Sequence, residues 1–124
     1  MSKQPNLLII WTDQQRADTL ACYGNDYIEA PHINKLAESS FVFENAYCVQ
    51  PVCTPSRASI LSGLWPHAHG SVTNNIPLDG KVKTIAEMVS EDYNCAYFGK
   101  WHLGDEVVAQ RNCKEWISIE DGIY

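Results

Sequence analysis

The sequence predicts an α/β fold in which a mostly parallel sheet is flanked by helices. Short apolar runs rich in β-forming residues alternate with segments whose apolar residues recur at helical spacing, a pattern typical of a parallel sheet. The chain of 124 residues is long enough to bury a core, and its 45% hydrophobic and 19% charged residues are ordinary for a globular protein. No internal linker is evident, so residues 1–124 are expected to form one domain.

The N-terminal part predicts a βαβ-like unit. The continuous apolar run Leu7–Trp11 predicts a strand buried on both faces. Such a strand would bring Asp13 to the carboxyl edge of the sheet, where α/β proteins bind ligands. Residues 31–40 predict a helix from their apolar spacing, and residues 41–43 predict the next strand.

The rest of the chain predicts two more helices and a strand. One helix extends from about residue 55 to 63, where proline suits the first turn and glycine the end. Thr84 is expected to cap another helix, and residues 95–98 predict a short strand that leads into residues 99–104. Residues 105–124 show no convincing closing element, so the fold is expected to be incomplete at the C-terminus.

Charge and composition exclude some partners and compartments. A net charge of -6 without a basic stripe argues against nucleic acid and anionic membranes as partners. The run Leu7–Trp11 is too short for a signal-peptide core or a membrane span. We therefore expect a cytoplasmic chain, or a periplasmic or secreted one if a leader has been removed. The 5 cysteines form no Cys-x-x-Cys pair, which favours reduced thiols.

The segment that starts at Cys53 places a thiol beside a predicted helix N-terminus. Free N–H groups and the helix dipole favour an anion there. Arg57 lies one turn further on, so its guanidinium can reach the same anion or the Cys53 side chain. Taken alone, such a cysteine is more often a small buried hydrophobe, and such an arginine a solvated helix residue.

The longer pattern, Cys-x-Pro-Ser-Arg followed by Leu-Ser-Gly, resembles the signature of type I sulfatases. In that family the cysteine is oxidised to formylglycine, so the resemblance implies this modification of Cys53 and a formylglycine-generating enzyme as a partner. It also implies that one hydroxyl of the hydrated aldehyde attacks the sulfur of a sulfate ester, and that deprotonation of the other releases sulfate. Residues 16–24 also resemble the family's sequence.

Asp13 and Gln14 follow the first predicted strand. Their side-chain oxygens are hard donors that suit Ca²⁺ or Mg²⁺. Alone, the pair would more often be a helix cap or a polar rim. The resemblance implies that Asp13, Gln14 and Cys53 bind a divalent cation, expected to be Ca²⁺, with Mg²⁺ or Mn²⁺ as alternatives. Many sulfatases have Asp-Asp here, and Gln14 resembles relatives that cleave phosphonate or phosphate esters.

Residues 99–104, Gly-Lys-Trp-His-Leu-Gly, are similar to another sulfatase signature. Extended residues alternate in direction, so Lys100 and His102 are expected on one face and Trp101 on the other. The resemblance implies that Lys100 contacts the sulfate and a formylglycine oxygen, and that His102 accepts a proton as sulfate leaves. Each alone would more often be a surface lysine or a core histidine, but agreement with the other motifs favours the catalytic interpretation.

Weaker signals lie in residues 66–74. Asn74 resembles a substrate-contacting asparagine of choline-sulfatase-like and phosphonate-hydrolase-like members, and it is equally well interpreted as a turn residue. His67 and His69 could be metal ligands, but a structured loop explains them at least as well.

The resemblance runs from about Asn6 to the C-terminus and implies an alkaline-phosphatase-like architecture. In it, Asp13, Gln14 and Cys53 meet at the sheet edge, while further ligands and leaving-group residues come from a later half that cannot be assigned here. We therefore expect the N-terminal part of a sulfatase catalytic domain acting on sulfate esters. One alternative is a phosphonate or phosphodiester hydrolase of the same superfamily. Another is an inactive truncated fragment that self-associates through an exposed sheet edge.

Overall fold

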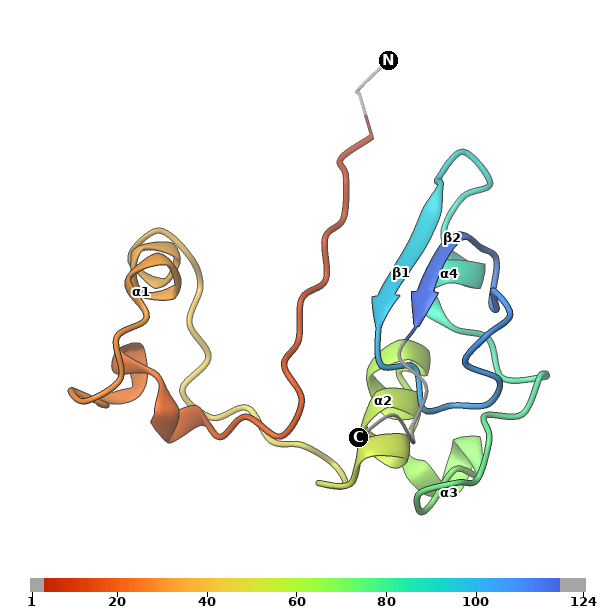
Figure 1. Cartoon of the computed structure of the whole chain (residues 1–124), viewed down its shortest axis with the longest axis horizontal. Coiled ribbons are helices and arrows are strands. Elements are labelled where there is room, and N and C mark those ends of the chain that lie inside the picture. The colour runs from red at the N-terminus through yellow and green to blue at the C-terminus, as the bar shows by residue number, and fades with distance from the viewer. Residues whose placement is uncertain (1–3, 119–124) are drawn as a thin grey trace. The chain divides into compact units, whose positions relative to one another are not determined.

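The computed structural model describes residues 4–118, and the chain forms two compact units, Met1–Ala46 and Tyr47–Tyr124. The elements in chain order are η1 (Ala17–Thr19), η2 (Ala21–Tyr23), α1 (Pro31–Glu38), α2 (Cys53–Ser62), α3 (Pro66–His69), α4 (Ile85–Met88), β1 (Cys95–Gly99) and β2 (Cys113–Ser118) (Figure 1). Within residues 4–118, no helix has the length and apolar character needed to cross a membrane.

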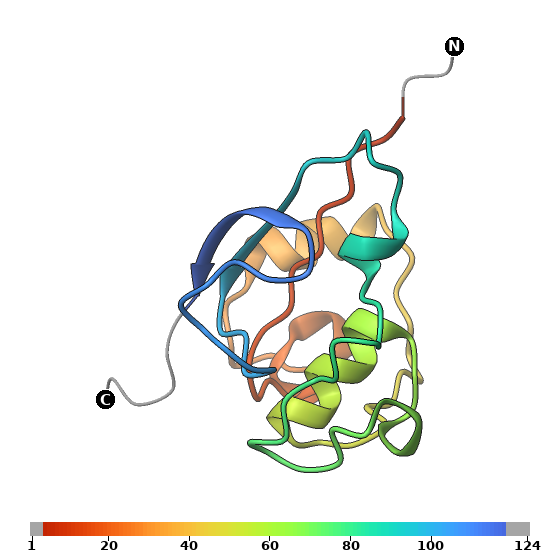
Figure 2. The ribbon, with the colours of Figure 1, turned by 90° about the vertical axis from the view of Figure 1, so that its right-hand side faces the viewer.

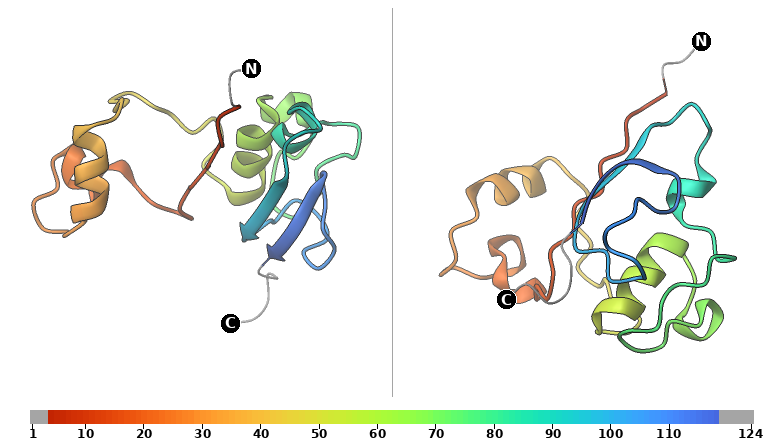
Figure 3. Two further views of the ribbon diagram at one scale, coloured as in Figure 1. Left: turned by 90° about the horizontal axis from the view of Figure 1, so that it is seen from above. Right: turned by 45° about the vertical axis from the view of Figure 1, so that its right-hand side comes forward.

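The second unit contains a parallel pair of strands, which confirms the predicted α/β class. β1 and β2 run in the same direction (Figure 3), and Tyr97 pairs with Trp116. The connection between the strands, residues 100–112, contains no helix (Figure 2). Sequence interpretation missed β2, because a register shift after Cys95 adds Lys114 as an extra residue and breaks the alternation of exposed and covered positions.

Helix α2 supplies much of the core of this unit. Its buried residues include Ala58 and Leu61, and the connection after β1 adds Trp101 and Leu103, each 1% exposed. Trp101 belongs to an aromatic cluster with Tyr97 and Trp116, whose ring centroids lie 5.0 to 5.1 Å apart. Such pairs contribute stability beyond the area that they bury. The cluster therefore joins both strands to the connection between them.

Local end signals place the helices where the sequence predicts them. Helix α2 ends at Gly63, whose left-handed φ of 71° suits a residue without Cβ. Thr84 caps α4 through a capping box with Glu87, as expected from its position, although α4 is only 4 residues long. Helix α1 also lies inside the predicted range 31–40.

The two strands predicted in the first unit are not formed. Neither Leu7–Trp11 nor residues 41–43 form a backbone ladder, and the side chains of Leu8 and Phe41 are 81% and 86% exposed. None of the described residues 4–46 is buried. β propensity makes a segment suitable for a sheet, but only a paired neighbour supplies its hydrogen bonds. The predicted βαβ unit is therefore wrong for this chain as it stands.

We expect Gly63→Ala to lower the free energy of unfolding by about 1 kcal/mol, because alanine at a left-handed φ is strained. A Cβ added at Gly63 would meet nothing within 4 Å, so the cost would be conformational. Gly80 is a matched control, since its Cβ position is equally open and its φ lies outside the left-handed range. Urea denaturation measures the free energy of unfolding of both variants. An equal loss in Gly63→Ala and Gly80→Ala would show that the left-handed φ of Gly63 is not the cause.

Candidate functional site

The first turn of α2 is hydrogen-bonded to residues 100–104, the turn that follows β1. We call this contact the joint. The hydroxyl of Thr54 donates to the carbonyl of His102 at 2.9 Å. The Arg57 guanidinium, 6% exposed, donates through Nη1 to the carbonyl of Lys100. Cys53 precedes Thr54 and lies one helical turn before Arg57, so these bonds join its part of α2 to the segment that contains Lys100 and His102.

Tyr97 adds a third donor to this joint. Its hydroxyl donates to the Lys100 carbonyl at 2.5 Å and lies 3.4 Å from Nη1 of Arg57. Burial raises the pKa of Tyr97, and the charge of Arg57 acts in the opposite direction. The phenol therefore remains a neutral donor at physiological pH, and the joint combines one charged and two neutral donors.

The N-terminus of α2 is less open to an anion than the sequence predicts. Cys53 is the first residue of the helix rather than a residue before it. The N–H of Thr54 donates to Oδ1 of Asn74 at 3.0 Å, and Pro55 has no N–H. Asn74 thus caps α2 from a distant segment. This placement supports the interpretation of Asn74 as a structural residue and leaves its contact with substrate a prediction.

His102 reaches its position through a turn, not through an extended strand. Its φ is 56°, so the alternation expected for residues 100–102 does not apply. The outcome is nevertheless similar, since Trp101 is buried while Lys100 and His102 remain partly exposed. Nε2 of His102 lies 3.4 Å from Oδ1 of Asn75.

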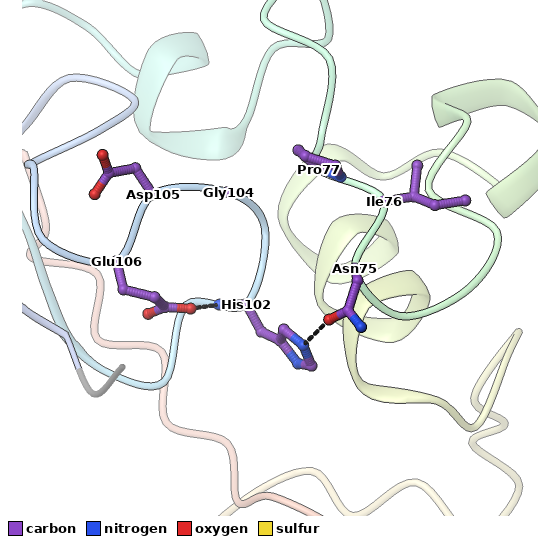
Figure 4. Close-up of a pocket in the computed structure, with 7 residues that line it drawn as sticks. All are labelled: Asn75, Ile76, Pro77, His102, Gly104, Asp105 and Glu106. Carbon is purple, nitrogen blue, oxygen red and sulfur yellow. Dashed lines mark hydrogen bonds between the residues drawn. The ribbon is translucent and has the colours of Figure 1, made fainter. Parts of the chain in front are cut away.

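A hollow of about 480 Å³ lies beside His102. Figure 4 shows the imidazole directed toward Asn75 across it, while the carboxylate of Glu106 meets the His102 backbone. The lining residues are Asn75, Ile76, Pro77, His102, Gly104, Asp105 and Glu106. None of these residues is a lysine or an arginine.

His69 joins α3 to α2 as a buried structural residue. Its Nδ1 accepts the N–H of Ser71 at 3.1 Å, and its Nε2 lies 3.0 Å from the hydroxyl of Ser59. An accepting Nδ1 places the proton of the neutral ring on Nε2. Burial lowers the pKa of His69, and the neighbouring His67 acts in the same direction. The residue therefore fits the structured-loop interpretation.

Asp13 and Gln14 lie in the first unit, where both are exposed and Gln14 has a left-handed φ of 55°. Within residues 4–118, no group of three or more His, Cys, Asp and Glu side chains is arranged to hold a metal ion. The oxygen donors of Asp13 and Gln14 still suit a hard cation. Their joint binding with Cys53 remains a prediction.

The structure thus bonds the first turn of α2, which begins at Cys53, to the backbone of Lys100 and His102, with Asn74 bonded to the same turn. The convergence of the side chains of Cys53, Lys100 and His102 remains a prediction. Sequence interpretation did not identify the residues that hold the joint, chiefly Thr54 and Glu106. Thr54 stands inside the Cys-x-Pro-Ser-Arg pattern, so the motif contained a usable signal. Nothing in the sequence around Glu106 distinguishes it from a surface carboxylate.

Comparison with known proteins identifies the family. The family model described as Sulfatase matches residues 5–118. The chain belongs to the sulfatase family. An ulvan-active sulfatase from Formosa agariphila is 43% identical over 101 residues, which cover 81% of this chain and 20% of that protein. An N-acetylglucosamine-6-O-sulfatase from Bacteroides thetaiotaomicron is 33% identical over 106 residues, covering 85% and 19% of the two chains.

A solved structure supports the same sulfatase fold. It contains a protein in complex with its substrate D-glucosamine-2-N,6-O-disulfate, and it matches with a TM-score of 0.80 and 29% identity over 92% of this chain and 23% of that one. The alkaline-phosphatase-like class is therefore confirmed. The chain spans about a fifth of the length of the curated sulfatases it matches.

Replacing Asn74 with alanine should lower the free energy of unfolding by about 1–2 kcal/mol, because the N–H of the buried residue Thr54 loses its acceptor. Asn74→Asp keeps the oxygen and should stay close to wild type. Thr73→Ala is the control, since Thr73 is an exposed neighbour of Asn74 whose φ lies outside the left-handed range. Chemical denaturation of the three variants tests whether Asn74 caps α2, and this role is contradicted if Thr73→Ala costs as much as Asn74→Ala.

His69 should make the stability of the second unit depend on pH. Its folded pKa lies below the usual unfolded value of about 6.5, so the unfolded state binds the proton more readily. The free energy of unfolding should be constant above that pH, and below it should fall by up to about 1.4 kcal/mol per pH unit. Urea titrations between pH 7.5 and 5.5 should show a weaker dependence in His69→Gln and a dependence closer to wild type in His67→Gln, because burial, the larger cause of the lowered pKa of His69, remains in that variant. An equal pH dependence of the free energy of unfolding in wild type, His69→Gln and His67→Gln would refute His69 as its origin.

Proposed function

We propose that this chain carries the formylglycine side of the active site of a sulfuric ester hydrolase. The observation that carries the proposal is the joint described above, in which Thr54 and Arg57 of α2 bind the carbonyls of His102 and Lys100. Two motifs separated by more than 40 residues are thereby bonded to each other, which supports a site in which their modifiable thiol, two cationic side chains and imidazole act together. Sulfate esters are anionic, which suits such a cationic site.

The residues of the chain can be assigned roles in this reaction. Formylglycine, once made from Cys53, would supply the nucleophilic hydroxyl of its hydrated aldehyde. Lys100 would attract the charged sulfate oxygens, and Arg57 would add positive charge from within the joint. His102 would move a proton at a ring nitrogen, with Asn75 Oδ1 available to accept from a protonated Nε2.

A divalent cation fits the donors of Asp13 and Gln14. The family generally uses formylglycine and such a cation, and two side-chain oxygens favour Ca²⁺, Mg²⁺ or Mn²⁺ over a soft metal. When bound, the cation would neutralise negative charge on the sulfate. We propose Ca²⁺ as the ion, held by Asp13, Gln14 and the modified Cys53.

Two other functions make different predictions. Gln14 favours a phosphonate or phosphodiester hydrolase of the same superfamily, and matched sulfate and phosphonate esters would distinguish the two activities by their relative rates. A truncated, inactive fragment that self-associates through a sheet edge would turn over neither ester. Turnover of an aryl sulfate by the matured chain would exclude that last alternative.

Coexpression with a formylglycine-generating enzyme should lower the mass of the chain by about 18 Da, because the Cys53 thiol becomes an aldehyde, whereas ordinary thiol oxidation raises the mass. Cys53→Ala should abolish the change, and Cys48→Ala, which removes another thiol, should leave it intact. Peptide mass spectrometry locates the modification. An unmodified Cys53 after coexpression, with a known substrate of the enzyme converted in parallel, would refute the proposal.

A further inference from the structure

Glu106 binds the backbone of the turn that carries His102. Its carboxylate accepts the N–H of Trp101 through Oε2 at 3.1 Å and the N–H of His102 through Oε1. Figure 4 shows the second contact, with the imidazole pointing away from Glu106. One carboxylate therefore accepts from two consecutive N–H groups, and hydrogen bonds to an ionised group are stronger than neutral ones.

His102 requires such support because of its conformation. A φ of 56° is unfavourable for a residue with a Cβ and persists only where the surroundings enforce it. The carbonyl of His102 is bound by Thr54 at 2.9 Å, so both polar groups of its backbone are anchored, from α2 on one side and from Glu106 on the other.

Strand β2 in turn fixes Glu106. The indole Nε1 of Trp116 donates to the carbonyl of Glu106 at 2.8 Å, and the hydroxyl of Ser118 donates to its Oε2. Trp116 also stacks on Tyr97 at 5.1 Å within the aromatic cluster. Strand β2 therefore supports the turn in two ways, through Glu106 and through the packing of Trp116 on Trp101.

We infer that Glu106 is a positioning residue for His102, holding the imidazole in the orientation that sulfate ester hydrolysis requires. The catalytic purpose of this orientation rests on the proposed function, whereas the contact of Glu106 with the turn does not. The neighbouring Asp105 differs, because within residues 4–118 its Oδ1 accepts the N–H groups of Val107 and Val108 in its own loop and none from the turn that carries His102. Asp105→Asn keeps that oxygen and removes the same charge, which makes it the matched control.

The test is NMR on the 124-residue chain with ¹⁵N-labelled histidine and backbone. In Glu106→Gln one acceptor oxygen is replaced by an amide donor, so the two N–H groups can no longer both be bound. The ring signals of His102 should shift, and the amides of Trp101 and His102 should exchange with solvent about tenfold faster. The ring signals of His69, in the same unit, should remain unchanged, and Asp105→Asn should leave His102 as in wild type.

Three results would overturn the inference. Unchanged His102 signals in Glu106→Gln would show that the carboxylate does not position the ring. Loss of the His69 signals in the same variant would show a general role in folding. An equal shift in Asp105→Asn would show an effect of charge alone.

A kinetic measurement separates this inference from the proposed function. In protein that hydrolyses an aryl sulfate, Glu106→Gln should lower kcat about tenfold or more while KM stays within about twofold. An unchanged kcat would refute the positioning role and leave the proposed hydrolase function intact. If no preparation hydrolyses the ester, the proposed function fails. The NMR measurement still decides, without any activity, whether Glu106 positions the ring of His102.

Discussion

The buried charge of Arg57 is the constraint on which the second unit depends. A guanidinium that is 6% exposed must keep its hydrogen-bond partners, because an uncompensated charge in a protein interior is costly. One of these partners is the carbonyl of Lys100, just beyond the end of β1. Helix α2, strand β1 and the following turn are thereby fixed to one another, and Trp101 packs next to this contact. The core and the candidate site share the same bond.

The helices could be predicted because their signals are local. Gly63 ends α2, and Thr84 with Glu87 starts α4, through contacts between residues close in sequence. Strands depend on partners far along the chain, and the sequence does not name them. The run Leu7–Trp11 has the composition of a buried strand but no ladder here, whereas β2 forms even though its bulge at Lys114 hides the expected alternation.

The candidate site was predictable to the extent that its residues belong to motifs. Cys53 and His102 were identified as site residues from sequence, and the structure connects their segments through Thr54. The contact of Glu106 could not be predicted, because a carboxylate accepts any nearby N–H and its partner is set by tertiary structure. The cap that Asn74 provides to α2 could not be predicted for the same reason. Asn74 lies 20 residues from Thr54 along the sequence, and only the tertiary structure brings the two together. The metal-binding role of Asp13 stays a prediction.

In the joint between α2 and the turn, the acceptors are main-chain oxygens. The bonds that fix the backbone are therefore independent of the side chains proposed to react. Thr54 and Arg57 bind the carbonyls of residues 102 and 100, groups that every amino acid provides. These two bonds therefore place no demand on which side chains stand at those two positions, and the left-handed φ of His102 disfavours β-branched residues most. Evolution could exchange the reactive groups there without rebuilding the architecture, so one backbone frame can serve enzymes with different chemical specificities.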